Sequence, residues 1–206
     1  MKTTSDSVET RKQRLREVIW ELLVAEGLAV PPFPVRGRIP NFVGSEQAAN
    51  HLDEIKEYRE ASIVLIAPDY VLFHARVKTL SGGKSILLAT PKLREGYLLL
   101  EHDKLKGLEK AASTISGSFR YGIRMKRAIG VDFVVEGCVA IDRSGNRLGK
   151  GGGYGDEEIS VARTLNPSVK VAAICSSKQI VDAVPFTQAD QPVDFIVTEI
   201  GVIRTR

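Results

Sequence analysis

The residues best suited to chemistry lie in a glycine-rich segment between residues 142 and 156. It holds five glycines between positions 149 and 155, the basic side chains of Arg147 and Lys150, and the carboxylate of Asp156. Glycines leave backbone N–H groups unshielded and permit positive φ angles. The segment follows an apolar run and precedes a helical pattern, so its N–H groups and the helix dipole can hold phosphate oxygens. The Asp156 carboxylate can hold Mg²⁺ against the phosphates, because Mg²⁺ favours carboxylate and phosphate oxygens.

This segment differs from the two best-known phosphate-binding loops. A Walker A loop requires Ser or Thr after its lysine, but Gly151 follows Lys150, and the spacing from Gly145 to Gly149 is one residue too short. A dinucleotide fingerprint requires a third glycine where Tyr154 stands. A glycine run is also typical of a mobile surface turn, and the residue pattern alone leaves that alternative open.

Apolar runs alternate with helix-periodic segments over most of the chain. Strands are expected at residues 62–67, 85–89, 97–100, 132–141, 169–175 and 194–198. Helices are expected at residues 11–26, 45–60, 71–80, 103–112, 119–128 and 157–165. The strand at 132–141 should break at Glu136-Gly137. Continuous apolar strands separated by helices predict a three-layer αβα fold with a mainly parallel sheet. Ligands of such sheets bind beyond the carboxyl ends of the strands.

The N-terminal region should pack on this domain. An amphipathic helix at 11–26 is followed by residues 31–41, which contain four prolines. Prolines forbid regular structure there, so the segment is a linker or a strap across a surface. We therefore expect one domain spanning residues 1–206, with residues 1–60 forming its N-terminal helices and strap.

Composition excludes several classes of protein. Of 206 residues, 43% are hydrophobic and 26% charged, which is typical of a globular chain and not of a disordered one. We find no apolar run long enough to span a membrane, and the first residues lack the apolar core expected of a signal peptide. The two cysteines are too few for a disulfide framework. The net charge of +4 is weak evidence for nucleic acid. We expect a cytoplasmic protein that is a monomer or a homodimer.

The order of residues in the glycine-rich segment is more specific than its composition. Gly145–Asp156 resembles the signature of the 5-formyltetrahydrofolate cyclo-ligase family, also called methenyltetrahydrofolate synthetase. The resemblance extends over most of the chain, through Lys12–Arg16, Asp132–Asp142, Gln179 and Ala189–Thr198. Three segments are more similar to a divergent branch, which includes archaeal members and the methenyltetrahydrofolate synthetase domain-containing proteins of animals. They are Arg38–Ser45, Thr90–Arg94 and Gly149–Glu158.

The resemblance implies an enzyme that uses ATP and Mg²⁺ to close 5-formyltetrahydrofolate, or a related reduced pterin, into its 5,10-methenyl form. In that reaction the formyl oxygen attacks the γ-phosphate, and the N10 nitrogen then expels phosphate. The implied nucleotide-binding residues are Lys12, Arg16, Arg147, Leu148, Gly149, Lys150, Gly151, Gly152, Gly153, Tyr154 and Asp156. The implied catalytic residues are Arg147, Lys150 and Tyr154; the metal ligands are Asp156 and Asp190; and the substrate-binding residues are Tyr70, Lys92, Arg94 and Tyr154.

Two positions depart from the family pattern. Gly155 replaces the second of two consecutive tyrosines, and Tyr70 stands where the family has a glutamate that contacts the pteridine. A phenol offers one hydroxyl, whereas a carboxylate accepts two N–H bonds. A second hypothesis is therefore a protein of the same fold that binds nucleotide and has lost folate chemistry.

Other clusters were weighed for different chemistry. The basic residues between Phe119 and Arg127, with aromatic residues among them, fit three interpretations: an RNA- or DNA-contacting stripe, a solvated helix face, or a group that reaches the nucleotide. The three histidines lack metal-ligand spacing. Cys138 and Cys175 lie in apolar strands, where buried inert thiols are expected.

Overall fold

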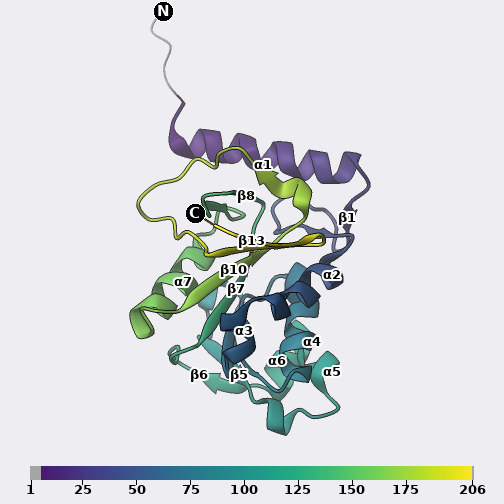
Figure 1. Cartoon of the computed structure of the whole chain (residues 1–206), viewed down its shortest axis with the longest axis vertical. Helices are drawn as coiled ribbons and strands as arrows, with labels where there is room; N and C mark the ends of the chain where they lie inside the picture. Colours follow the sequence, from purple (N-terminus) through teal and green to yellow (C-terminus); the bar gives the residue numbers. More distant parts are fainter. Residues whose placement is uncertain (1–5, 206) are drawn as a thin grey trace, which may run out of the picture.

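The computed structural model describes residues 6–205, and its centre is an eight-stranded mixed sheet (Figure 1). In spatial order the strands are β13 (Gly201–Arg204), β12 (Phe195–Thr198), β10 (Lys170–Ile174), β7 (Phe133–Gly137), β3 (Ile63–Ile66), β4 (Ser85–Ala89), β5 (Tyr97–Leu100) and β6 (Ile123–Met125). The pairings from β12 through β4 are parallel, and the outer pairings are antiparallel. The predicted, mainly parallel sheet is confirmed.

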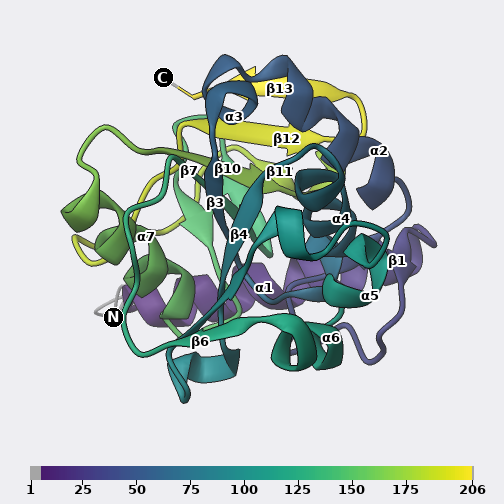
Figure 2. The same ribbon diagram turned by 90° about the horizontal axis from the view of Figure 1, so that it is seen from below.

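Helices cover both faces of this sheet (Figure 2). They are α1 (Val8–Ala25), α2 (Ser45–Asn50), α3 (Lys56–Glu60), α4 (Phe73–Ser81), α5 (Glu109–Ala112), α6 (Ile115–Tyr121) and α7 (Tyr154–Leu165). Short 3₁₀ helices are η1 (His51–Glu54), η2 (Tyr70–Leu72), η3 (Pro91–Leu93), η4 (His102–Lys104) and η5 (Ser177–Gln179). Because successive strand side chains point to opposite faces, Val64 and Ile66 join the core beside α2 and α4, whereas Leu65 joins the core beside α7. The three-layer prediction is therefore confirmed.

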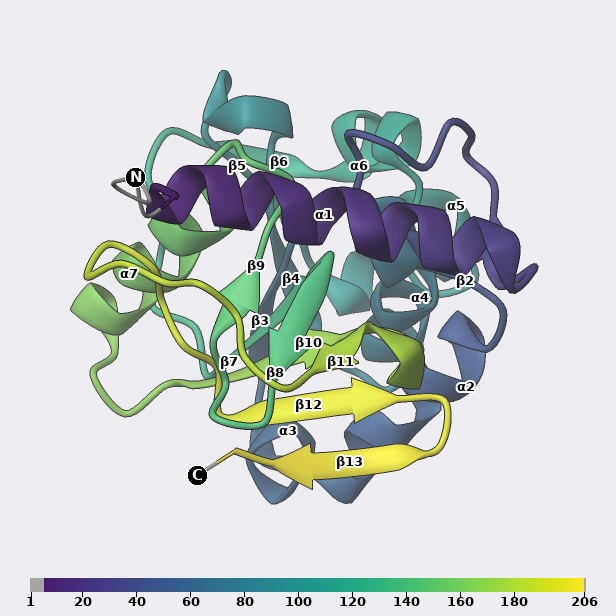
Figure 3. The ribbon, with the colours of Figure 1, turned by 90° about the horizontal axis from the view of Figure 1, so that it is seen from above.

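Two small sheets tie the N-terminal region to this core. One contains β11 (Ile180–Val181), β8 (Ala140–Asp142) and β9 (Arg147–Leu148), and the other pairs β1 (Ala29–Val30) with β2 (Asn41–Phe42). Helix α1 lies across the first of them (Figure 3). Residues 31–40 contain no helix or strand, as their prolines predict. The indole N–H of buried Trp20 donates to Arg38 O at 3.0 Å and so ties this strap to α1.

The continuous helix expected at 45–60 is wrong. The structure has α2, then η1, then α3, with Ile55 extended between the last two. Ala49, Leu52, Ile55 and Tyr58 are all buried, at steps of three residues. An α-helix repeats every 3.6 residues, so a strict three-residue repeat favours tighter and broken turns.

The helix expected at 119–128 is also wrong. Helix α6 ends at Tyr121, and the chain then forms β6, which pairs with β5. A Cβ at Gly122 would lie 2.5 Å from Ser118 O and 3.1 Å from Leu98 Cβ, so the glycine allows close approach to the sheet. The basic side chains therefore share no helix face, and Arg124 forms an ion pair with Glu95. This removes the predicted helical RNA-contacting stripe.

Smaller boundary errors also have local causes. Only Glu109–Ala112 of the helix expected at 103–112 is α-helical, because Gly107 has a φ of +82°. Strand β7 continues through Gly137, which pairs with Ile174, and the break falls at residues 138–139, where the chain leaves for another sheet. Helix α7 begins at Tyr154 rather than at residue 157. Within residues 6–205 no helix combines the length and apolar character of a membrane span.

Candidate active site

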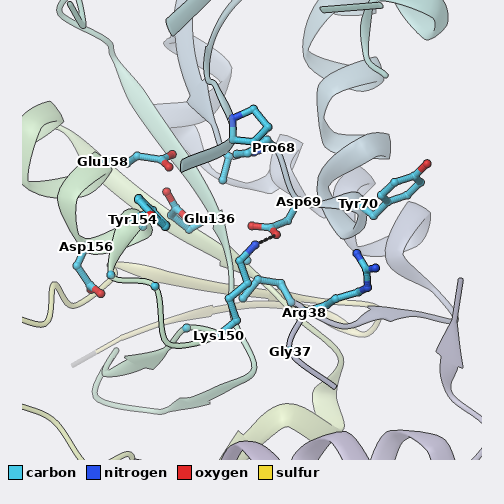
Figure 4. Close-up of a pocket in the computed structure, with 18 of the residues that line it drawn as sticks. Gly37, Arg38, Pro68, Asp69, Tyr70, Glu136, Lys150, Tyr154, Asp156 and Glu158 are labelled. Carbon is cyan, nitrogen blue, oxygen red and sulfur yellow. Dashed lines mark hydrogen bonds and ion pairs between the residues drawn. The ribbon is translucent and has the colours of Figure 1, made fainter. Parts of the chain in front are cut away.

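A cavity of about 310 Å³ opens where the parallel strands end (Figure 4). Its walls include Asp69 after β3, Thr90 after β4 and Gly137 at the end of β7. The glycine-rich segment forms the opposite wall, from Gly149 to Asp156. This is the edge at which the sheet predicted a ligand site. The structure therefore brings the glycine-rich segment to the strand ends, as a binding loop requires.

The glycine-rich segment ends as the N-terminus of α7. Gly151 has a φ of +103° and Gly153, the N-cap residue, a φ of +73°, conformations that glycine adopts without strain. Within residues 6–205 no side chain caps this helix, and its first residues line the cavity. The first N–H groups of a helix have no partner inside it, and the helix dipole makes this end positive. The cavity thus has a wall suited to anions.

Helix α1 contacts the glycine-rich segment through the side chain of Arg16. The buried Arg16 side chain donates from Nε to Gly149 O at 2.9 Å, and its guanidinium carbon lies 3.6 Å from where a Cβ of Gly151 would be. Lys12 Nζ lies 2.6 and 2.7 Å from the two carboxylate oxygens of Asp190. Asp190 also accepts from Thr187, and these donors lower the pKa of its carboxyl, against the effect of burial. Lys12 and Arg16 are therefore bound to protein groups and are not a solvated face.

Asp156 lies where the loop meets α7. Its Oδ1 accepts from Arg147 Nη2 at 2.7 Å and from the Gln191 backbone N–H at 3.0 Å. In the described part of the chain no three His, Cys, Asp or Glu side chains form a metal-binding group. Mg²⁺ commonly needs only one or two carboxylates when phosphates supply other oxygens, so Asp156 fits that role. Asp190 would first have to exchange its bonds to Lys12.

A second basic side chain crosses the cavity. Lys150 Nζ lies 2.6 Å from Asp69 Oδ1. Figure 4 marks this ion pair with a dashed line. The loop that carries Asp69 is fixed by Arg76, which donates to Ala67 O at 2.9 Å and to Asp69 O at 3.0 Å. Arg76 is 2% exposed, and this burial lowers its pKa to about 10. Sequence reasoning missed Arg76, because an arginine within an amphipathic helix is ordinarily exposed.

The remaining sequence-predicted substrate residues are placed differently. Tyr70 borders the cavity but is 60% exposed, and its ring extends away from Asp69 and Glu136 (Figure 4). Tyr154 lines the cavity beside Glu136. Arg94 is exposed, and Lys92 lies in η3, whose neighbouring Thr90 and Pro91 border the cavity. The Lys92 side chain lies outside the described part of the structure.

Two buried carboxyls that the sequence reasoning did not select lie deep in the cavity. Glu136 of β7 is 2% exposed and Glu158 of α7 is 3% exposed. Burial raises the pKa of Glu136 to about 8, although the nearby Arg147 guanidinium opposes that shift. The pKa of Glu158 is also raised, first by burial and then by Glu136. In the sequence, Glu136 could have been selected because it is a charged residue within an otherwise apolar strand.

The fold and site place the chain among three-layer α/β proteins with a glycine-rich loop at the strand ends. Two solved structures share this fold. The 5,10-methenyltetrahydrofolate synthetase of Aquifex aeolicus is 22% identical with a TM-score of 0.61, and the similarity covers 95% of this chain and 93% of that one. The synthetase of Mycoplasma pneumoniae is 12% identical with a TM-score of 0.54, covering 91% and 98%.

The family is established by sequence. The model of the 5-formyltetrahydrofolate cyclo-ligase family matches residues 8–199, and the chain belongs to this family. The mouse and human methenyltetrahydrofolate synthase domain-containing proteins are each 33% identical, over 94% and 97% of this chain. In both cases the match covers 55% of the relative, so the chain spans about half the length of these curated relatives.

Proposed function

We propose that the protein catalyses the ATP- and Mg²⁺-dependent cyclisation of 5-formyltetrahydrofolate, or of a related reduced pterin, to the 5,10-methenyl form. The observation that carries this proposal is the uncapped N-terminus of α7 behind a glycine-rich loop, in a chain of the cyclo-ligase family. That wall suits the triphosphate of ATP, and the rest of the cavity receives the second substrate.

Under this proposal the chain works mainly by positioning and charge neutralisation. Loop N–H groups from Gly149 to Gly153 and the α7 N-terminus hold the phosphates, and Arg16 fixes the loop through Gly149 O. Arg147 and Lys150 stabilise negative charge on the transferred phosphoryl group. Asp156 would hold Mg²⁺, which would supply further neutralisation of the phosphate charge. Lys150 is exposed, and its one ion-pair partner among the described residues is Asp69, so it can exchange that partner for phosphate.

The proposed roles of the other residues follow their places in the cavity. Tyr154 packs on the nucleotide or the pterin, because it lines the cavity next to the loop. Tyr70, Lys92 and Arg94 remain proposed contacts to the outer, anionic part of a folate. Lys12 and Asp190 act together behind the loop, with Asp190 available to a metal only after release of Lys12.

A second candidate is a nucleotide-binding protein that lacks folate chemistry. The exposed Tyr70 ring and the absence of a side chain at Gly155 favour it, since neither position supplies the family's folate contact. It predicts the same ATP affinity and the same dependence on the loop, without turnover of 5-formyltetrahydrofolate.

An absorbance assay for the methenyl product tests both candidates. Wild-type protein, Asp156→Asn and the control Glu157→Gln, an exposed neighbour on α7, are mixed with 5-formyltetrahydrofolate, ATP and Mg²⁺. The cyclo-ligase predicts turnover in the wild type and in Glu157→Gln, and little turnover in Asp156→Asn or without ATP. ATP binding without turnover in the wild type would replace the first candidate by the second. Absence of ATP binding would reject both.

A further inference from the structure

The cavity is lined by more acids than the catalytic proposal uses. Its charged residues are the bases Arg38, Arg147 and Lys150 and the acids Asp69, Glu136, Asp156 and Glu158. Lys150 pairs with Asp69 and Arg147 pairs with Asp156. Among the described residues no ion pair includes Glu136 or Glu158. Two carboxyls therefore face the cavity without a direct ionic partner.

These two carboxyls also lack hydrogen-bond partners on one oxygen each. Glu136 Oε1 and Glu158 Oε2 are buried and unpartnered within residues 6–205. A buried polar atom without a partner costs free energy, so such atoms are rare unless a ligand or a proton completes them. Both oxygens belong to residues that line the cavity, so a ligand bound there can donate hydrogen bonds to them.

Gly155 makes room for this pair. A Cβ at position 155 would lie 2.9 Å from Glu136 Oε2 and 3.0 Å from Arg147 Nη2. A tyrosine there could not coexist with the observed positions of Glu136 and Arg147. The glycine at position 155 and the observed position of the Glu136 carboxyl are therefore sterically linked.

The chemistry of the pair selects its ligand. Two carboxyls repel anions, so phosphate belongs against the N–H groups of the glycine-rich loop and not against the pair. A carboxylate accepts two parallel N–H bonds from a planar group, as it does from a guanidinium. A 2-amino-4-oxopyrimidine ring presents such an edge, with its 2-amino group beside a ring N–H. Adenine presents its amino group beside an acceptor nitrogen, so an ionised carboxylate can accept only one N–H bond from that edge.

We propose that the Glu136 and Glu158 carboxyls bind the adjacent amino and ring N–H donors of a 2-amino-4-oxopteridine. The identification of that ring with the substrate rests on the proposed function, whereas the recognition of its donor edge rests on the cavity alone. The pair is a specificity determinant of the cavity and takes no part in phosphoryl transfer.

Binding of free heterocycles tests this proposal without ATP or turnover. The affinities of pterin and lumazine, in which an oxygen acceptor replaces the 2-amino group, are measured by quenching of ligand fluorescence. The proteins are wild type, Glu136→Gln, Glu158→Gln and the exposed control Glu157→Gln. The substitutions keep side-chain size, and thermal unfolding together with ATP affinity shows whether each variant is folded.

The wild type and Glu157→Gln are expected to bind pterin more tightly than lumazine. Substitution of either member of the pair by glutamine removes an acceptor oxygen and should weaken pterin binding by about tenfold or more, the value of charge-assisted bonds, and abolish that preference. Unchanged pterin affinity in both Glu136→Gln and Glu158→Gln would overturn the proposal, as would equal wild-type affinity for the two rings. Pterin recognition without cyclisation would reject the proposed function alone, and cyclisation with unaffected pterin binding would reject this inference alone.

Discussion

Replacement of Glu136 by glutamine should stabilise the protein at alkaline pH more than at acidic pH. Burial raises the pKa of Glu136 in the folded chain from 4.5 to about 8. The folded state therefore holds a proton that the unfolded chain releases as pH rises. The stability associated with Glu136 is fully present below the unfolded pKa, declines as pH rises above 4.5, and is lost at about pH 8. Glutamine does not titrate and avoids this loss.

The magnitude follows from the shift. One pKa unit corresponds to about 1.4 kcal/mol, and most of the interval between 4.5 and 8 lies between pH 5 and pH 8. The gain from Glu136→Gln should therefore be larger at pH 8 than at pH 5 by roughly 3 kcal/mol. The double difference is the gain in unfolding free energy from Glu136→Gln at pH 8 minus the same gain at pH 5. This subtraction cancels any effect of the buried amide that does not depend on pH.

Urea unfolding at the two pH values measures this quantity directly. Wild type and Glu136→Gln are compared with Glu157→Gln, which removes the same charge from an exposed position. The control should change the free energy of unfolding by less than about 0.5 kcal/mol at either pH. A double difference for Glu136→Gln below about 1 kcal/mol, or one of opposite sign, would refute the burial of an unpaired carboxyl.

Three further substitutions test the supports of the site. Arg76→Met should lower the free energy of unfolding by about 3 kcal/mol or more in urea, because it removes the side-chain donor of the buried carbonyl oxygens of Ala67 and Ser113. A loss under about 1 kcal/mol would contradict this role. Gly155→Ala should lower the free energy of unfolding by about 1–3 kcal/mol in thermal unfolding, and should weaken pterin binding, because the added Cβ would lie 2.9 Å from Glu136 Oε2. A neutral effect would mean that Glu136 can move freely. Lys150→Ala should weaken ATP binding by about tenfold in calorimetry. The free energy of unfolding should stay within about 0.5 kcal/mol of the wild type, because the ion pair of Lys150 is exposed. Unchanged ATP affinity would reject the phosphate-binding role of Lys150.

The fold was predictable where one short-range pattern dominates. The apolar runs of the parallel strands are buried on both faces, so they predicted β3, β4, β7 and β10 directly. The segments at 45–60 and 119–128 failed because tertiary contacts decided them. Burial of every third residue from position 49 to 58 favoured the 3₁₀ helix η1. Residues 123–125 pair with β5 and so form an edge strand. Such contacts join residues distant in sequence, which a local pattern does not contain.

The site divides in the same way. The glycine-rich loop was predictable because its residues are contiguous, and its helix begins at the last of the positive-φ glycines. The carboxyl pair was not, since Glu136 and Glu158 come from a strand and a helix that meet only in the folded chain. Arg76 was missed for the same reason, because its partners lie in the loop after β3 and at Ser113.

Phosphate release coupled to product formation tests the central claim most directly. Purified protein is supplied with ATP, Mg²⁺ and limiting 5-formyltetrahydrofolate, and inorganic phosphate and the methenyl product are measured in the same sample. We expect one phosphate for each methenyl group formed, and no phosphate above background without 5-formyltetrahydrofolate. Phosphate released independently of the folate, or methenyl product formed without ATP, would contradict an ATP-driven cyclo-ligase at this site.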